Sequence, residues 1–380
     1  MDAIIVLDRV QFAAVRVNAN TEWSFAEVYD LHGASAAAEF GITTGSPEVG
    51  ERIAELVGVL AGRPLDDEQA VVEAAGIDPG LLTPISITSV AVSALRNIVT
   101  VLQALHAGVS LTEKLGGTAA SSVELYANIN RALLGRYRSP ASFGRVAERA
   151  AGRGFRTIKC APFDEVDKTR TADSAVEASR TGVERVAAVR AAIGPDIRLL
   201  VDCHRRFDLE SALRVAEELA KLDVGWFEEP VDIESSQDDM AEIARRVSMP
   251  VAGGESLYGV ESFEALLEKR ATHVIMPDVM LCGGASEAYR TGLLAHRLGA
   301  GFSPHSPSGT VPLLTSAHVC AALPDAMPLE HAVDEAPWRH ELLDPPERVE
   351  DGRLWFPGGP GLGATLNAEA IDRRGRRWEP

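Results

Sequence analysis

The chain has 380 residues, a formal net charge of −18 and 46% hydrophobic residues. This length suggests two domains, or one barrel with an additional region, and the composition excludes a disordered or collagen-like chain. The negative charge argues against a nucleic-acid or anionic-membrane partner, because both would require a basic surface on the protein.

The first 120 residues predict an α+β region. Residues 2–40 alternate in hydropathy as antiparallel strands do, without the basic start of a signal peptide. Helical spacing of apolar residues follows at 48–62, 66–76 and 86–106. Gly108 ends the last of these helices. Because no run of 18 apolar residues is present, we expect no membrane span and a cytoplasmic protein.

From residue 121 onward, short apolar runs alternate with amphipathic helices such as 174–194 and 285–300. The predicted strands are 123–130, 156–162, 197–204, 225–230, 250–256, 273–279, 301–306 and 327–333. The strands are apolar on both faces, as expected where helices cover the outside of a parallel sheet. The alternation predicts an α/β fold with a parallel barrel of the (β/α)8 type. The four cysteines are too sparse for a disulfide framework and predict buried free thiols.

Ionisable residues end each of the last six predicted strands. They are Asp202 with His204, Glu228, Glu255, Asp278, His305 and Glu330. Successive members lie 23 to 27 residues apart, about one strand and one helix. One acid at a strand end is uninformative because acids often cap the next helix, but six in succession are not. Since the active sites of such barrels lie at the carboxyl ends of the strands, we expect these side chains to converge.

Asp202, Glu228 and Glu255 end three consecutive strands, and adjacent strands lie about 4.8 Å apart. Three carboxylates at one level can bind one hard cation, and oxygen-only ligands favour Mg²⁺ over Zn²⁺. Glu229 follows Glu228 directly, and since successive strand residues point to opposite faces, only one of them should be a ligand. The same alternation places His204 on the side of Asp202.

Further polar residues at the strand ends are candidates for a site. A carboxylate such as Asp278 beside an imidazole such as His305 fixes the tautomer and raises the basicity. Lys159 on the second strand faces the side opposite to its buried neighbouring cysteine. Asn128 and Asn130 end the first strand and could bind hydroxyl groups, or could pair only with the backbone.

The motifs VDCH, WFEEP, GGES, MPDVMLCGG and SPHSPSG occur in this order. Through them the chain resembles the enolase superfamily, specifically its mandelate racemase subgroup, over nearly its whole length. The resemblance implies a TIM-type (β/α)7β barrel at 121–340, an N-terminal α+β capping domain at 1–120 and a segment at 341–380 that returns to the capping domain. We also expect a homo-oligomer.

The same resemblance implies roles for individual residues. The Mg²⁺ ligands would be three carboxylates, Asp202, Glu228 and Glu255. Asp278 and His305 would form the general-base dyad, and Glu330 would hydrogen-bond the substrate carboxylate. The Asp-x-His pattern ending at His204 is similar to that of sugar-acid dehydratases such as galactonate dehydratases, in which this histidine is the general acid.

Two features depart from the family pattern. Racemases of the subgroup carry Lys-x-Lys on the second strand, where this chain has Lys159, Cys160 and Ala161. A racemase needs a base on both faces of the α-carbon, so the missing lysine favours dehydration. The cap segment YDLHGASAAAEFG lacks the usual acidic turn of the family, so the identity of the substrate is not predicted. Glu22 and Trp23 are predicted to reach the substrate from the cap.

The sequence thus predicts Mg²⁺-dependent dehydration of an acid sugar, an aldonate or aldarate, to a 2-keto-3-deoxy acid. His305 would remove the α-proton to give an enediolate, and His204 would protonate the leaving β-hydroxyl. Lys159 and Glu330 would lie near the substrate carboxylate. The alternatives are a racemase or epimerase with Lys159 as second base, and a non-catalytic barrel that acts as a binding protein.

Overall fold

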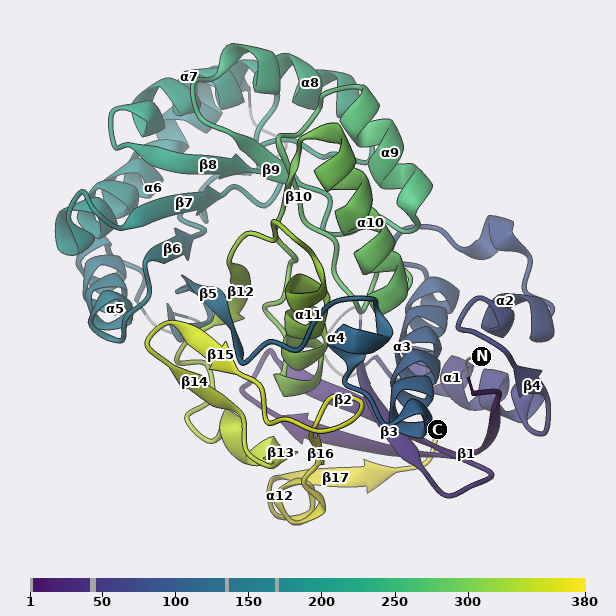
Figure 1. Ribbon diagram of the computed structural model, residues 1–380. Coiled ribbons are helices and arrows are strands. Elements are labelled where there is room, and N and C mark those ends of the chain that lie inside the picture. The colour runs from purple at the N-terminus through teal and green to yellow at the C-terminus, as the bar shows by residue number, and fades with distance from the viewer. Residues whose placement is uncertain (1–2, 42–45, 134–136, 168–170) are drawn as a thin grey trace.

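The computed structural model describes residues 3–41, 46–133, 137–167 and 171–380. Its N-terminal part is an antiparallel sheet packed with helices, seen at the bottom and right of Figure 1. Strands β1 (Ile5–Arg16), β2 (Glu22–Asp30) and β3 (Ser35–Phe40) pair in this order, and β17 (Gly375–Trp378) pairs with the other side of β1. The strands predicted at 2–40 are confirmed, except that residue 2 lies outside the described residues.

The other elements of this part are β4 (Pro64–Leu65), η1 (Pro79–Leu81), α1 (Pro47–Leu60), α2 (Ala70–Ala74), α3 (Ile87–Ala107) and α4 (Leu111–Lys114). The helix predicted at 66–76 is shorter than expected. Strand β4 pairs with β1, and the Asp67 carboxylate accepts a hydrogen bond from the Ala70 amide at 3.0 Å, so the helix begins only there.

Helix α3 confirms the helix predicted at 86–106. The Ser86 hydroxyl accepts a hydrogen bond from the Ser89 amide at 3.1 Å at its start, and Gly108 ends it with a φ of 68°. By length and composition this helix could cross a membrane, but 89% of its most apolar window is buried inside the protein. We therefore interpret α3 as a core helix.

Eight parallel strands of the described chain form the barrel in the upper part of Figure 1. They are β5 (Ser122–Asn128), β6 (Thr157–Cys160), β7 (Arg198–Asp202), β8 (Val224–Glu228), β9 (Val251–Gly253), β10 (Val274–Ile275), β11 (Gly301–Phe302) and β12 (Leu329–Ala332). Each pairs with the next from β5 to β11, and β12 pairs with β5. The Met327 amide donates to the Phe302 carbonyl at 2.9 Å and links β12 to β11.

Between consecutive strands, within the described residues, run the outer helices α5 (Pro140–Gly152), α6 (Ala172–Ile193), α7 (Leu209–Ala220), α8 (Gln237–Arg246), α9 (Val260–Glu268), α10 (Ala285–Leu298) and α11 (Thr310–Ala322). A short turn, η2 (Arg131–Leu133), precedes α5, and η3 (Arg339–Leu342) follows β12. The (β/α)7β barrel with an N-terminal capping domain is therefore confirmed.

The last segment contains β13 (Leu343–Asp344), β14 (Arg348–Glu350), β15 (Arg353–Trp355), β16 (Thr365–Leu366) and α12 (Ala368–Arg374). Strand β15 pairs with β5 of the barrel, and β17 then pairs with β1 of the cap. The chain thus passes from barrel to cap near its end. The exact domain limits at 120 and 340 stay a prediction.

Two apolar layers hold the barrel together. The inner cluster consists of Tyr126, Leu200, Trp226, Ala252, Val274 and Met276. It fills the space inside the strands, and its Tyr126 and Trp226 rings meet edge to face at 5.6 Å. The larger cluster packs strands against helices and includes Cys160 and Cys203. All four cysteines are buried and free, as predicted.

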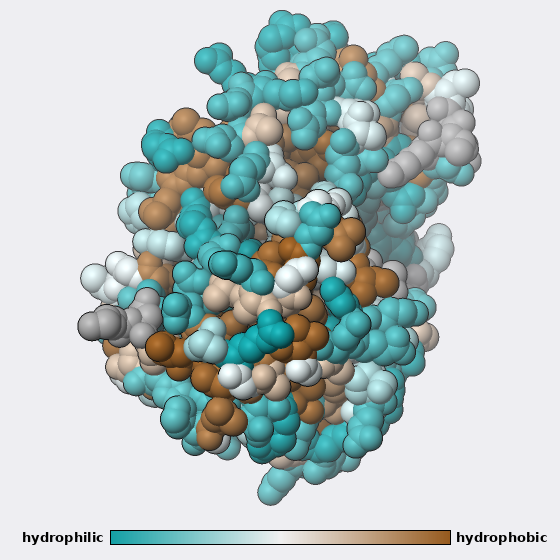
Figure 2. Space-filling view, turned by 90° about the vertical axis from the view of Figure 1, so that its right-hand side faces the viewer, coloured by the Kyte–Doolittle hydropathy of each residue, from teal (hydrophilic) through white to brown (hydrophobic). Residues whose placement is uncertain are grey.

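The surface of the molecule is mainly hydrophilic on the face at the right of Figure 1, with hydrophobic residues in patches toward the middle (Figure 2). The exposed large hydrophobic side chains of the described residues are Ile4, Leu31, Val59, Leu81, Ile87, Tyr137, Leu293 and Leu298. Leu293 and Leu298 share α10, and the others lie in different parts of the chain.

Candidate active site

A cavity of about 500 Å³ lies at the carboxyl ends of the barrel strands. The predicted residues that line it are Asn128, Asn130, Lys159, Asp202, His204, Glu255, His305 and Glu330. Glu228 and Asp278 are buried behind this lining and hydrogen-bond to it. The strand ends therefore bring the predicted polar set together, as the order of strands suggests.

The strands are shorter than predicted, so the local position of several site residues differs. Glu255, Asp278 and His305 lie in the loops after β9, β10 and β11. In one such loop the Asp278 carboxylate accepts a hydrogen bond from the Met280 amide at 2.8 Å, which replaces strand pairing with a turn. The prediction that Glu330 ends its strand is also wrong, because it lies within β12 and its side chain reaches the site from there.

Lys159 connects two buried carboxylates on opposite sides of the barrel. Its Nζ lies 2.7 Å from Glu228 Oε1 and 2.8 Å from Glu330 Oε1. Trp226 Nε1 donates to Glu228 at 3.0 Å, and Asn128 donates to Glu330 at 2.7 Å. Burial lowers the pKa of Lys159, but the two carboxylates outweigh burial and raise it well above its ordinary value. Lys159 is thus held as an ammonium ion.

His204 and Asp202 form one imidazole–carboxylate pair. His204 Nε2 lies 2.7 Å from Asp202 Oδ2, and the His204 amide donates to Oδ1 at 2.8 Å. The pairing results from a turn, since His204 has a φ of 47° after the end of β7. The charge of Asp202 outweighs burial and raises the pKa of His204 to about 9. His204 is therefore an imidazolium ion near neutral pH.

His305 and Asp278 form the second pair. His305 Nδ1 lies 2.8 Å from Asp278 Oδ2, which fixes the tautomer and leaves Nε2 on the side of Glu255, at 3.2 Å from its Oε2. Burial lowers the pKa of His305, but Glu255, Asp278 and Glu330 together raise it to about 10. The two imidazoles thus face one cavity, each with its own carboxylate.

Donor chemistry at the three predicted metal ligands suits a hard cation. Asp202 and Glu228 are paired residues of β7 and β8, and Glu255 follows β9, the next strand. Burial, together with repulsion from Asp202 and Glu255, raises the pKa of Glu228. A cation bound among these oxygens would offset that repulsion. Their oxygens pair here with Lys159, His204 and others, and no group of three His, Cys, Asp or Glu in the described residues has metal-site geometry.

Glu228 and Glu229 point to opposite sides of the barrel wall, as the strand alternation predicts. Glu228 contacts Lys159 inside the barrel, whereas Glu229 pairs with Arg205 at 2.5 Å and accepts the Gly254 amide at 2.8 Å. Only Glu228 of the two faces the other candidate ligands.

Three polar residues of the cavity were not predicted: Arg131, Arg138 and Asp164. Arg138 Nε lies 2.5 Å from Asp164 Oδ2, and its Nη2 donates to the Ala161 carbonyl at 2.7 Å. These residues follow β5 and β6, so their position after a barrel strand was the available signal. Asn130 also lines the cavity while its side chain accepts the Ala161 amide at 2.9 Å.

Glu22 and Trp23 lie in an adjoining cavity of about 330 Å³, which shares Arg131 and Pro307 with the larger one. The Glu22 carboxylate pairs with Arg376 at 2.9 and 3.0 Å, so its charge is directed toward the cap sheet. Neither Glu22 nor Trp23 lines the larger cavity, and their contact with a substrate stays a prediction.

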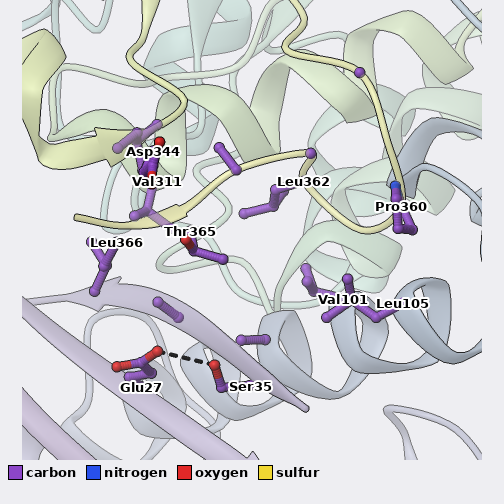
Figure 3. Close-up of a pocket in the computed structure, with 16 residues that line it drawn as sticks. Glu27, Ser35, Val101, Leu105, Val311, Asp344, Pro360, Leu362, Thr365 and Leu366 are labelled. Atoms are coloured by element: carbon purple, nitrogen blue, oxygen red, sulfur yellow. Dashed lines mark hydrogen bonds between the residues drawn. The ribbon is translucent and has the colours of Figure 1, made fainter. Parts of the chain in front are cut away.

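Another cavity, of about 210 Å³, lies between α3, the β2–β3 hairpin and residues 358–366 (Figure 3). Its lining is mostly apolar, with Val101 and Leu105 on one side and a Ser35–Glu27 hydrogen bond of 3.0 Å on another. None of the predicted site residues lines it. We therefore place the candidate site in the barrel.

Comparisons with known proteins give a consistent picture. Residues 142–370 match the family described as Enolase C-terminal domain-like. A D-xylonate dehydratase from Haloferax volcanii is 33% identical over 190 residues, which cover 50% of this chain and 46% of that protein. A D-galactarolactone cycloisomerase from Agrobacterium fabrum is 31% identical over 276 residues, covering 70% and 68%. The chain spans about half the length of several curated relatives that it matches.

The whole fold also matches a solved structure. A mandelate racemase/muconate lactonizing enzyme-like protein from Rubrobacter xylanophilus has a TM-score of 0.84 and 27% identity, and the match covers 98% of each chain.

Proposed function

The chain belongs to the enolase superfamily, and on that premise we propose that it dehydrates an acid sugar, an aldonate or aldarate, to a 2-keto-3-deoxy acid. The observation that carries this proposal is the pair of imidazoles, His305 and His204, which face one cavity and each contact a carboxylate. Loss of water from adjacent carbons requires such a pair, a base for the α-proton and an acid for the β-hydroxyl. The names of several relatives, dehydratases of xylonate, gluconate and arabinonate, agree with this reaction.

In the proposed first step, His305 acts as the base. Its Nδ1–H donates to Asp278, and Nε2 faces Glu255, whose charge raises the pKa of His305. With the charge of Glu255 offset by a bound cation, Nε2 would carry the lone pair that accepts the α-proton of the substrate. The electron pair of the C–H bond moves toward the substrate carboxylate and forms an enediolate. Asp278 stabilises the imidazolium that results, because its carboxylate lies 2.8 Å from the ring.

In the second step, His204 acts as the acid. The electron pair of the enediolate returns to form a double bond between the α- and β-carbons, and the bond from the β-carbon to its hydroxyl breaks. His204 Nε2 pairs with Asp202 at 2.7 Å, so the proton on Nδ1 passes to this hydroxyl, which leaves as water. The enol product then tautomerises to the 2-keto-3-deoxy acid.

Lys159 would bind the substrate carboxylate at the base of the cavity, with Glu330 beside it as a carboxylate that orients the ammonium. The Lys159 ammonium offers positive charge, and Glu330 is held in place by Lys159, Asn128 and the Ser306 amide. We assign the Mg²⁺ ligands to Asp202, Glu228 and Glu255. When bound there, Mg²⁺ supplies positive charge that stabilises the negative charge formed on the substrate carboxylate.

The alternatives from the sequence receive less support. A racemase or epimerase would need Lys159 as a neutral second base, but its Nζ donates to two carboxylates, and Ala161 carries no base. A non-catalytic barrel would not need two imidazole–carboxylate pairs in one cavity.

Isomerisation of a lactone is a further candidate, because the name of the Agrobacterium fabrum relative states that activity. The cytoplasmic location and the homo-oligomer stay predictions.

A screen of acid sugars with Mg²⁺ for 2-keto acid formation tests the proposal. Formation of a 2-keto acid supports dehydration, whereas epimerised or lactone-derived products without it would support an isomerase. No Mg²⁺-dependent turnover of any acid sugar would support the non-catalytic protein.

Two histidine variants then test the roles. His305→Asn should abolish exchange of the α-proton in D₂O, while His204→Asn should block dehydration and can leave exchange intact. His296→Asn is the matched control, because His296 forms the same kind of pair with Asp325, at 2.8 Å, outside the cavity. Normal exchange in His305→Asn, or normal dehydration in His204→Asn, would refute the corresponding assignment.

A further inference from the structure

Glu229 joins three parts of the chain behind the candidate metal site. Its Oε2 accepts a hydrogen bond from Arg205 Nε at 2.5 Å. Its Oε1 accepts the backbone amides of Gly254 at 2.8 Å and Glu255 at 3.4 Å. Glu229 is only 1% exposed, so these contacts are made away from water. One carboxylate therefore ties the backbone that carries Glu255 to the loop after β7.

Arg205 contacts the same loop directly. Its Nη2 donates to Ser256 Oγ at 3.0 Å and lies 3.6 Å from Glu255 Oε1. Its other terminal nitrogen lies 3.3 Å from Glu234. The planar guanidinium can make these contacts in different directions at once, which the single ammonium group of a lysine cannot do.

Charge adds to this geometry. Arg205 faces the carboxylates of Glu229, Glu255, Glu234 and Asp232, the last at 4.0 Å. Without the guanidinium, Glu229 and Glu255 would repel each other across a loop that Glu229 itself anchors.

The backbone of this network adopts conformations that need support. Arg205 has a φ of 59° and Glu229 a φ of 34°, both unusual for residues other than glycine. Gly254 has a φ of 105°, which glycine can adopt at little steric cost because it has no Cβ. Contacts among these residues therefore hold the loop in a shape that it would otherwise populate less.

We propose that Arg205 and Glu229 are positioning residues that hold Glu255 in place as a ligand for Mg²⁺. The proposal rests on the function proposed above. Removing either side chain should leave Glu228 and Asp202 unaffected, since these lie on β8 and β7, but should free the Glu255 loop to move. Loss of such outer contacts typically weakens metal binding by about 10- to 100-fold.

The test is calorimetric titration of Mg²⁺ into metal-free protein. Arg205→Lys keeps the positive charge but loses the planar guanidinium with its several N–H donors. Glu229→Gln keeps the size of the side chain but loses its negative charge. Glu287→Gln is a matched control, because Glu287 accepts the Val260 amide at 2.8 Å through Oε1 and pairs with Arg290 at 2.5 Å through Oε2.

We expect Mg²⁺ to bind both test variants about 10- to 100-fold more weakly than wild type, and the control within twofold. The midpoint temperature of thermal unfolding in EDTA should fall no further in the test variants than in the Glu287→Gln control. If Glu229→Gln fails to fold, Arg205→Lys decides. Unchanged Mg²⁺ affinity in the test variants, with or without lost stability, overturns the positioning role alone. Wild-type protein that neither binds Mg²⁺ nor forms a 2-keto acid overturns the proposed function as well.

Discussion

Glu39 predicts an unusual dependence of stability on pH. This residue of β3 is 4% exposed, and its Oε1 accepts the Gly309 amide at 3.0 Å, whereas Oε2 has no hydrogen-bond partner among the described residues. Burial raises the pKa of Glu39 from its ordinary 4.5 to about 8, although the Gly309 amide and Arg339 lower it in part. The folded protein therefore keeps the proton where the unfolded chain has lost it.

The sign of the effect follows from this difference. Because the folded pKa of Glu39 lies above the unfolded value, its contribution to stability is complete below pH 4.5 and is lost as the pH rises through about 8. At about 1.4 kcal/mol for each pH unit, the full loss is about 5 kcal/mol. Glu39→Gln keeps an oxygen for the Gly309 amide and cannot ionise, so this loss should disappear.

The assay is urea unfolding of wild type and Glu39→Gln at pH 5 and pH 8.5. Between these values the variant should gain about 4 kcal/mol in unfolding free energy relative to wild type, since other titrations cancel in the difference. The variant Glu51→Gln, at an exposed position, serves as control. Its unfolding free energy relative to that of wild type should change little between the two pH values. A difference between Glu39→Gln and wild type that stays constant from pH 5 to 8.5 would refute the reasoning.

Two further changes are expected to act on stability. Lys159→Met removes the ammonium between the buried carboxylates Glu228 and Glu330. The free energy of unfolding in EDTA at pH 7.5 should therefore fall by about 3–5 kcal/mol. A fall of less than about 1 kcal/mol would contradict the buried ion pairs. His318 is buried, which lowers its pKa from 6.5 to about 4, so its contribution is complete above pH 6.5 and is lost as the pH falls through 4. The free energy of unfolding of His318→Gln, measured in urea, should therefore rise by about 3 kcal/mol relative to that of wild type between pH 7 and pH 4. An equal difference between variant and wild type at both pH values would argue against a buried neutral imidazole.

The arrangement of the barrel was readable from the chain because parallel strands must alternate with helices and each strand is apolar on both faces. That regularity also placed Asp202, Glu228 and Glu255 at one end of the barrel, since the carboxyl ends of all its strands share one rim. The alternation of side chains likewise separated Glu228 from Glu229. These inferences needed only local periodicity and spacing.

Other features depend on contacts between distant segments, which no local pattern encodes. Glu330 reaches Lys159 from within a strand, and Glu22 of the cap is paired by an arginine near the end of the chain. No local pattern marks Arg205, yet in the folded chain it contacts acids from the loops after β8 and β9. The chain order determined which strand ends share the rim, because backbone pairing is repetitive. Tertiary packing decided which charges pair there, because each pairing depends on the position of side chains from several loops at once.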